Sequence, residues 1–484
     1  IKLPIYCIKL VWRKLDMDAI KSRIQCKNPI VINLKSGLEY KHSCISQTWK
    51  CILSRVRSLS IETDVNGLRT CCRKLKAANN IKKISFRLHK SSDKIPYCIL
   101  NRLVNHYFGN RISKLALRIF GFNRETFEKD NFIKSLKRKA LLEDLTIEPE
   151  DAVISLSLFK DLKRLRKLRH LNLFGICNYP HQFLSCLPYL TQLESFEAAF
   201  ENFNDHPKQY FEIWKTIKDF ENIKSVSYYL SQKDELYRIH KTIPSYIYQS
   251  MTNKNLLQFG LNLEDLVVDK SSIHALGDQL AILEKLKALS LDFDDCIFKV
   301  ESDDMRKFGH SIKGLNELRN LELSFPLLSD NLMSPFYQSL GQIPSLQGLN
   351  LAFIFGDMSP ELNDLQDFLA KQKSLIHMSL QINNVDAPSV HVTEALFFHV
   401  VNGVKDLSNL ESLNIKGNFF HGKRKHDNML KLLLCKKIKL KEQENDELLK
   451  FIGKSSVLSK AFMDKEEDKG IKLRIDKFGN VEKI

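Results

Sequence analysis

The sequence lacks the motifs that mark several common classes of enzyme. It contains no H-E-x-x-H zinc motif, no G-x-S-x-G nucleophile motif and no G-x-G-x-x-G dinucleotide motif. Gly453-Lys454-Ser455 resembles the end of a phosphate-binding loop, but Leu448 stands where that loop requires its first glycine. We therefore expect no catalytic residues, no cofactor and no enzymatic activity.

Long apolar runs, closely paired cysteines and N-x-[ST] glycosylation sites are also missing. No apolar run approaches the roughly 18 residues that a membrane-spanning helix needs, so we expect no membrane insertion. The 11 cysteines include no C-x-x-C pair, which argues against a zinc site, and we expect reduced, mostly buried thiols. These absences predict a protein of the cytoplasm or the nucleus that holds no metal ion.

One short apolar motif, Φ-x-x-Φ-x-Φ with Φ an apolar residue, recurs thirteen times along the chain. The six clearest copies are Leu168-Leu171-Leu173, Leu286-Leu289-Leu291, Leu318-Leu321-Leu323, Leu346-Leu349-Leu351, Leu375-Met378-Leu380 and Leu410-Leu413-Ile415. Weaker copies centre on Leu59, Ile84, Leu115, Leu145, Phe196, Val226 and Leu266. The mean spacing is about 29.5 residues, within the range of leucine-rich repeats. The widest gap, from Val226 to Leu266, holds an insertion at residues 232–255.

Each repeat is predicted to contain one strand and one helix. The last two apolar positions of the motif alternate along the chain, which is typical of a strand with one buried face. Segments such as 305–313 and 336–340 have helical spacing and polar faces. Because such a unit cannot bury its apolar face alone, we expect neighbouring units to stack and their strands to form a parallel sheet.

Thirteen such motifs resemble the leucine-rich-repeat family, in its long ribonuclease-inhibitor-like class, over residues 51–420. The resemblance implies an α/β solenoid shaped like a horseshoe, with the parallel sheet on the concave face and helices on the convex face. The family places an asparagine three residues after the last leucine, where only Asn383 and Asn418 match. Elsewhere that position is held by Asp64, Asp294, Pro326 or Ile354. This departure predicts irregular turns and an uneven arc.

The net charge of +17 conceals an uneven distribution of charge along the chain. Residues 1–180 hold 37 Lys and Arg against 15 Asp and Glu, whereas residues 181–420 hold 20 against 31 and residues 421–484 hold 17 against 11. This change in the sign of the net charge along the chain favours a protein partner whose own surface carries both signs of charge. Specific nucleic-acid binding is not expected, because the basic clusters are not interleaved with base-stacking aromatic residues.

The residues beside the apolar positions of each motif should project onto the concave surface and form a strip that binds the partner. The early repeats contribute Lys83, Arg87, Lys114 and Arg118. The middle repeats contribute Glu197, Asp265, Asp269, Asp292, Asp294 and Glu322, and the later ones His377 and Gln381. The function that this strip indicates is a non-enzymatic scaffold for protein–protein interaction.

The two ends of the chain are predicted to cap the solenoid. Residues 1–50 are interpreted as a helical cap, and residues 421–484 as a basic cap and tail. Leu3-Pro4 and the apolar spacing after it also resemble the opening of an F-box, a module that binds the adaptor of a cullin-type ubiquitin ligase. The closing residues would be Cys44 and Trp49, later than in that module and after a strand-like segment at 30–32. On this alternative the chain is the substrate receptor of such a ligase.

Overall fold

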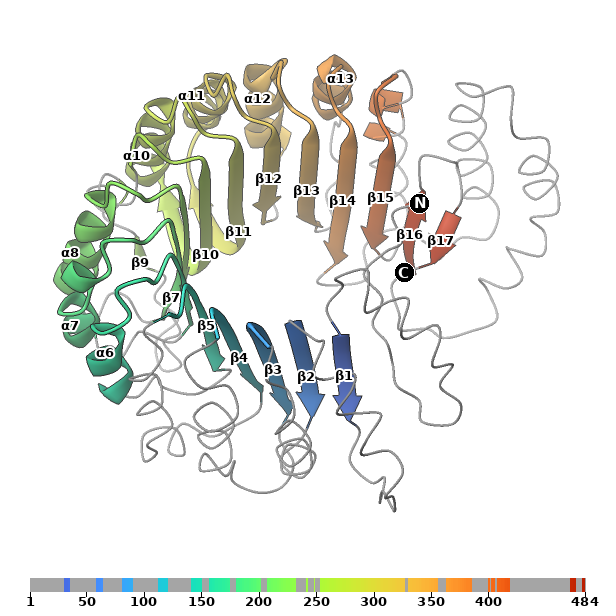
Figure 1. Cartoon of the computed structure of the whole chain (residues 1–484). Coiled ribbons are helices and arrows are strands. Elements are labelled where there is room, and N and C mark those ends of the chain that lie inside the picture. The colour runs from blue at the N-terminus through green and yellow to red at the C-terminus, as the bar shows by residue number, and fades with distance from the viewer. Residues whose placement is uncertain are drawn as a thin grey trace, which may run out of the picture. The chain divides into compact units, whose positions relative to one another are not determined.

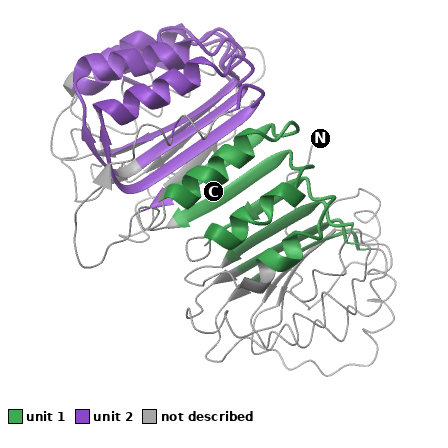
Figure 2. Ribbon diagram, turned by 90° about the vertical axis from the view of Figure 1, so that its left-hand side faces the viewer, with its two compact units in different colours: residues 1–229 green, residues 230–484 purple. Residues whose placement is uncertain are grey.

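The computed structural model divides into two compact units, residues 1–229 and residues 230–484 (Figure 2). The structure describes residues 30–34, 58–63, 81–89, 112–120, 141–149, 156–174, 180–201, 207–231, 241–242, 248, 253–326, 330–355, 363–384, 399–400, 402–404, 407–417, 471–475 and 481–483. Everything below concerns these residues. The predicted domain bounds at residues 50 and 420 fall where little of the chain is described, so they stay predictions.

In unit 1, seven consecutive strands pair in parallel. They are β1 (Ile30–Leu34), β2 (Ser58–Thr63), β3 (Lys83–His89), β4 (Lys114–Phe120), β5 (Asp144–Pro149), β6 (His170–Leu173) and β7 (Ser195–Glu201). β8 (Ser225–Ser231) follows along the chain. The pairing places the centres of successive motifs opposite one another: Ile84, Leu115, Leu145, Leu171 and Phe196. All five side chains are buried.

In unit 2, six strands pair in parallel in chain order. They are β10 (Gln258–Asp269), β11 (Ala288–Lys299), β12 (Asn320–Phe325), β13 (Gly348–Phe355), β14 (His377–Asn384) and β15 (Ser412–Gly417). β16 (Ile471–Ile475) then pairs antiparallel with β15, and β17 (Val481–Lys483) pairs antiparallel with β16. The parallel ladder of repeats therefore ends at β15, and the two strands that follow it are paired antiparallel.

Helices connect the strands and lie against one side of the sheet in each unit (Figure 1). Unit 1 contains α6 (Leu156–Leu162), α7 (Pro180–Leu184), the 3-10 helix η5 (Leu187–Tyr189) and α8 (Pro207–Lys218). Unit 2 contains α10 (Lys270–Ala281), α11 (Ser302–Lys313), α12 (Asp330–Leu340) and α13 (Asn363–Lys371). The helices predicted at 305–313 and 336–340 are thereby confirmed.

The core of each unit lies between its strands and its helices. In unit 2 the Phe293 and Phe325 rings stack at 5.6 Å between centroids, and Phe325 meets Phe336 of α12 at 5.3 Å. The last leucines of four motifs, Leu291, Leu323, Leu351 and Leu380, are paired in register and buried. The predicted α/β fold of stacked strand–helix repeats is confirmed, and the architecture is that of a leucine-rich-repeat solenoid.

The structure corrects one repeat centre that the sequence pattern placed at Leu266. The centre that pairs with Leu289 is Phe259, and Leu261 pairs with Leu291. Leu266 lies further along β10, between the register shifts that begin after Asn262 and the pairing that resumes at Val267, next to Asp265, whose φ of 59° is left-handed. Both segments alternate apolar residues, so periodicity alone could not choose between them. The spacing becomes 33 residues before Phe259 and 30 after it, which is more even than the pattern suggested.

The insertion between β8 and β10 is attached to unit 2 at two points. β9 (Lys241–Thr242) pairs in parallel with the extension of β10, where Leu266 faces Lys241. Tyr248 is 1% exposed, and its hydroxyl is hydrogen-bonded to Ser272 at the start of α10. Burial raises the pKa of the Tyr248 phenol far above its usual value, so the group stays neutral.

Strand β1 bears on the F-box interpretation of residues 1–50. It pairs in parallel with β2, with Ile30 opposite Leu59 and Ile32 opposite Ile61, and so extends the ladder of repeats. The sequence pattern at 30–32 had indicated this strand. Because an F-box is built from helices, a strand at this position counts against that interpretation. The segments that would carry Leu3-Pro4, Cys44 and Trp49 lie outside the described residues.

Candidate protein-binding face

The side of each sheet opposite the helices is lined by the polar residues that alternate with the core, and we call it the open face. In unit 1 it comprises Lys83, Ser85, Arg87, Lys114, Ala116, Arg118, Asp144, Thr146, Glu148, His170, Asn172, Ser195 and Glu197. In unit 2 it comprises Gln258, Gly260, Asn262, Ala288, Ser290, Asp292, Asn320, Glu322, Ser324, Gly348, Asn350, Ala352, His377, Ser379 and Gln381. No described helix covers it.

The open face of unit 1 neutralises much of its own charge. Lys114 Nζ lies 2.7 Å from the Asp144 carboxylate, and Arg118 Nε lies 2.7 Å from that of Glu148. Both pairs join residues that face each other directly across β4 and β5. On β3, Lys83 faces Lys114 and Arg87 faces Arg118. The structure thus brings the four predicted basic residues together, and Lys114 and Arg118 have acidic partners on β5.

Glu197 lies at the other end of this face, on β7. The Asn172 amide donates a hydrogen bond to its carboxylate from the facing position on β6. Burial, followed by repulsion from Glu148, raises the pKa of Glu197 above its usual value despite Arg118 and the Asn172 hydrogen bond. The side chain is therefore easier to protonate than an exposed glutamate.

The open face of unit 2 has a different charge pattern. Its predicted residues Asp292 and Glu322 lie on adjacent strands and accept hydrogen bonds from neutral groups. Asn262 Nδ2 donates to Asp292 Oδ2 at 2.7 Å, and Ser290 Oγ donates to Glu322 Oε2 at 3.0 Å. The Asn350 amide donates to the other oxygen of Glu322. Among the open-face side chains described on β10–β14 there is no Lys or Arg.

Two predicted site residues have structural positions outside the open face. Asp265 lies at the irregularity in β10, and Asp269 is the N-cap of α10. The Asp269 carboxylate accepts the Ser272 backbone N–H at 2.8 Å and the Ser271 hydroxyl at 3.0 Å. Against the effect of burial, these bonds lower the pKa of Asp269. Both predictions depend on a repeat centre at Leu266, which the strand register moves to Phe259, so the proposed contact surface does not include these two residues.

The remaining predicted residues lie at the C-terminal part of unit 2. His377 Nδ1 is 2.9 Å from the Ser412 hydroxyl on the neighbouring strand, and Gln381 faces Lys416 in the same ladder. Asp294 belongs to β11, but its side chain lies outside the described residues. His377 and Gln381 thus share one open face with Asp292 and Glu322.

Sequence reasoning missed the partners that organise this face. Asp144, Glu148, Asn172, Asn262 and Ser290 were not singled out, although each one lies directly opposite, or hydrogen-bonded to, a predicted residue. The signal that could have found them is the motif alignment itself. Equivalent positions of successive repeats become neighbours in a parallel ladder, so an acid that follows a base by one repeat predicts a cross-strand pair.

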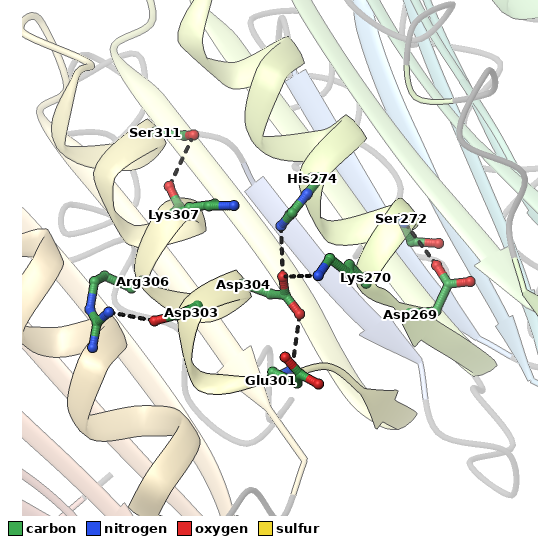
Figure 3. A network of polar contacts seen from close by, with 10 residues as sticks. All are labelled: Asp269, Lys270, Ser272, His274, Glu301, Asp303, Asp304, Arg306, Lys307 and Ser311. Atoms are coloured by element: carbon green, nitrogen blue, oxygen red, sulfur yellow. Dashed lines mark hydrogen bonds and ion pairs between the residues drawn. The ribbon is translucent and has the colours of Figure 1, made fainter.

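A second polar cluster lies among the helices of unit 2 (Figure 3). Asp304, 1% exposed, accepts the Glu301 backbone N–H at 3.0 Å as part of a capping box at the start of α11. From α10, His274 Nε2 lies 2.8 Å and Lys270 Nζ 3.6 Å from Asp304 Oδ1. Burial opposes ionisation, but the Glu301 N–H, Lys270 and His274 outweigh it and lower the pKa of Asp304. The cluster links α10 to α11.

We expect the stability of the protein to fall in acid through Asp304. Its folded-state pKa is below the ordinary 3.8, so the folded state binds this proton more weakly than the unfolded state. The stabilisation is therefore complete above pH 3.8 and is lost as the pH falls through the folded-state pKa. Urea midpoints measured across this range should fall less in Asp304→Asn than in the wild type. Asp303→Asn, at an exposed neighbouring carboxylate, should retain the full wild-type loss; equal curves for all three proteins would contradict the assignment.

Known proteins give little further guidance. No family model and no curated protein matches the chain. Among solved structures, it is similar to a chain of the Toll–Spätzle complex, described as a molecular hub in Drosophila development and innate immunity, with 12% identity and a TM-score of 0.31. The match covers 83% of this chain and 54% of the Toll–Spätzle chain, so this chain spans about half the length of that one. The fold assignment rests on the strand register described above.

The described residues offer neither a metal site nor a membrane span. They contain no group of three or more His, Cys, Asp or Glu side chains placed to hold a metal ion. No described helix is both long and apolar enough to cross a membrane. Cys186 and Cys296 are buried, as predicted, and neither is in a disulfide; the other cysteines lie outside the described residues.

Proposed function

We propose that this protein is a scaffold that binds another protein through the open face of its repeats. The observation that carries the proposal is a ladder of parallel strands whose outer side chains are polar, hydrogen-bonded in fixed positions and uncovered by any described helix. Such a surface offers many oriented donors and acceptors at little further entropic cost, which favours recognition of a folded or extended polypeptide.

The proposal does not include catalysis or a ubiquitin-ligase adaptor. The polar residues of the open face bond to one another in cross-strand pairs and do not converge on a common point. For residues 1–50, the strand β1 favours an additional repeat at this end of the ladder. We therefore retain the scaffold as the proposed function, acting in the cytoplasm or the nucleus.

A matched pair of bulky substitutions tests which side of the protein binds. Ala352 lies on the open face and Ala370 lies in α13, and both side chains are partly exposed. Proximity labelling in the native cell should show that Ala352→Trp loses most of the proteins labelled by the wild type, at least about tenfold, because a large ring blocks the face. Ala370→Trp should retain them. Equal retention, or loss only with Ala370→Trp, would contradict binding at the open face.

A further inference from the structure

A strongly basic segment joins α6 to β6 in unit 1, and we call residues 160–169 the basic turn. It contains one acidic residue, Asp161, and six cations. The cations are Lys160, Lys163, Arg164, Arg166, Lys167 and Arg169. Five of them are exposed, and Lys163 is partly exposed. Because the turn directly precedes β6, it lies at the N-terminal ends of the strands and outside the open face.

Three buried leucines hold the basic turn in a fixed conformation. Leu162, Leu165 and Leu168 are each 0% exposed. The backbone N–H of Leu165 donates to Leu162 O, and that of Leu168 donates to Leu165 O, both at 2.9 Å. Runs of this composition are also found in nuclear localisation signals. A receptor that binds such a run as an extended peptide would have to remove these leucines from the core, so the cations are suited to recognition as a folded surface.

The charge of the basic turn is only partly neutralised. Arg169 forms an ion pair with Glu194 of the next repeat, but Lys224 lies 3.3 Å from the same carboxylate, so one acid serves two cations. Asp161 is buried, and its carboxylate oxygen lies 3.9 Å from Arg164, beyond hydrogen-bonding distance. Within the described part of the chain, no ion pair joins an acid to Lys160, Arg166 or Lys167.

Two exposed apolar side chains flank the basic turn in the neighbouring repeats. Leu141 is 46% exposed and Tyr189 is 47% exposed, and they are two of the four large apolar side chains that are exposed among the described residues. Leu141 occupies the position of Lys167 one repeat earlier, before centres that face each other across β5 and β6. On the other side, Lys163 Nζ lies 5.6 Å from the centroid of the Tyr189 ring. The cations therefore lie between two apolar contacts.

We propose that the basic turn, with Leu141 and Tyr189 beside it, is a second binding surface, for an acidic segment of a protein that carries apolar side chains between its carboxylates. Three of the six cations are arginines, whose paired N–H donors match the two oxygens of a carboxylate. The apolar side chains add contact area that a purely charged ligand does not use. A nucleic acid is less suited, because its bases stack on open aromatic faces and Lys163 covers one face of Tyr189.

Two synthetic peptides test the proposal with the full-length protein. Each has ten residues, six of them glutamate, and the other four are leucine in the first peptide and serine in the second. Calorimetric titration should give at least about threefold tighter binding of the leucine peptide, because it covers the two exposed apolar side chains. The double variant Arg166→Gln/Lys167→Gln should weaken binding of that peptide about fivefold, because it removes two exposed ion pairs.

Matched substitutions in the turn between α10 and β11 provide the controls. Lys285→Gln/Lys287→Gln removes the same net charge from that turn and should leave the affinity unchanged. Leu141→Ser should abolish the preference for the leucine peptide, because one of the two apolar contacts is lost. Ile282→Ser makes an equivalent change at a side chain that is 49% exposed, and it should retain the preference.

Several results would overturn the proposal. Equal weakening by the two double variants would show general attraction to a basic protein. Failure of both peptides to bind would exclude an acidic segment, and binding of oligothymidine or of phosphatidylserine vesicles that Arg166→Gln/Lys167→Gln weakens would then identify a phosphate-bearing partner. Ala352→Trp should bind the leucine peptide as the wild type does, and loss of binding in that variant would place the peptide on the open face instead.

Discussion

Replacing Gly309 by alanine should destabilise the protein by about 2 to 3 kcal/mol, the usual cost of forcing an extra carbon into a packed core. Gly309 lies in α11, directly against Phe336 and Ser339 of α12. A Cβ built there would lie 2.8 Å from the Phe336 carbonyl oxygen, and still closer to Ser339 Oγ. The serine could rotate, but a backbone carbonyl cannot move without displacing α12. The measurement is the free energy of urea unfolding, with hydrogen exchange to locate the loosened segment.

Gly314→Ala is the matched control for this substitution. Gly314 ends the same helix with φ of −66°, and a Cβ there would meet Ser311 O at an ordinary 3.4 Å. We expect a change within about 0.5 kcal/mol, because no strain is introduced. In Gly309→Ala, exchange should rise in peptides from α11 and α12. Equal stability of the two variants would show that the α11–α12 contact is looser than described.

Replacing Gln372 by leucine should cost about 3 kcal/mol, because buried backbone groups lose their partners. The side chain is 0% exposed, directly follows α13, and bonds two backbone groups of the turn after α12 and one of α13 itself. Its Nε2 donates to Gly341 O at 2.7 Å and Phe368 O at 3.0 Å, and its Oε1 accepts the Ile343 N–H at 3.1 Å. Leucine fills a similar volume but satisfies none of them.

The exposed residue Gln347 provides the control for Gln372. Gln347→Leu is the same substitution in the preceding repeat, but the Gln347 side chain is exposed to solvent. Its unfolding free energy should stay within about 0.5 kcal/mol of the wild type. Hydrogen exchange at Ile343 should accelerate in Gln372→Leu alone. A stable Gln372→Leu variant with an unchanged Ile343 amide would show that the turn does not depend on this side chain.

The sequence predicted the repeat fold because the same short pattern recurs at nearly constant spacing. All thirteen predicted motif centres lie on strands, because a short alternation of apolar residues is typical of a strand with one buried face. Within β10, however, the predicted centre was at the wrong position, because this strand continues beyond an irregularity and contains two apolar segments. Only the register against Leu289 distinguishes Phe259 from Leu266.

The candidate site could be predicted only in outline. Alternation indicates which residues leave the core, and it placed Lys114, Arg118, Asp292 and Glu322 on the open face. It does not indicate which of them already have partners, because that depends on the facing repeat. Gln372 and Asp304 were also beyond prediction, since a buried polar residue and an exposed one read alike in a single sequence.

Site-specific photo-cross-linking in the native cell tests the central claim most directly. A photo-reactive residue is placed either at position 381, on the open face of β14, or at position 307, on the exposed side of α11. The account predicts that position 381 cross-links a second polypeptide and that position 307 does not, with Ala352→Trp abolishing the cross-link. A cross-link formed from position 307 alone would place the partner on the helices and contradict the account.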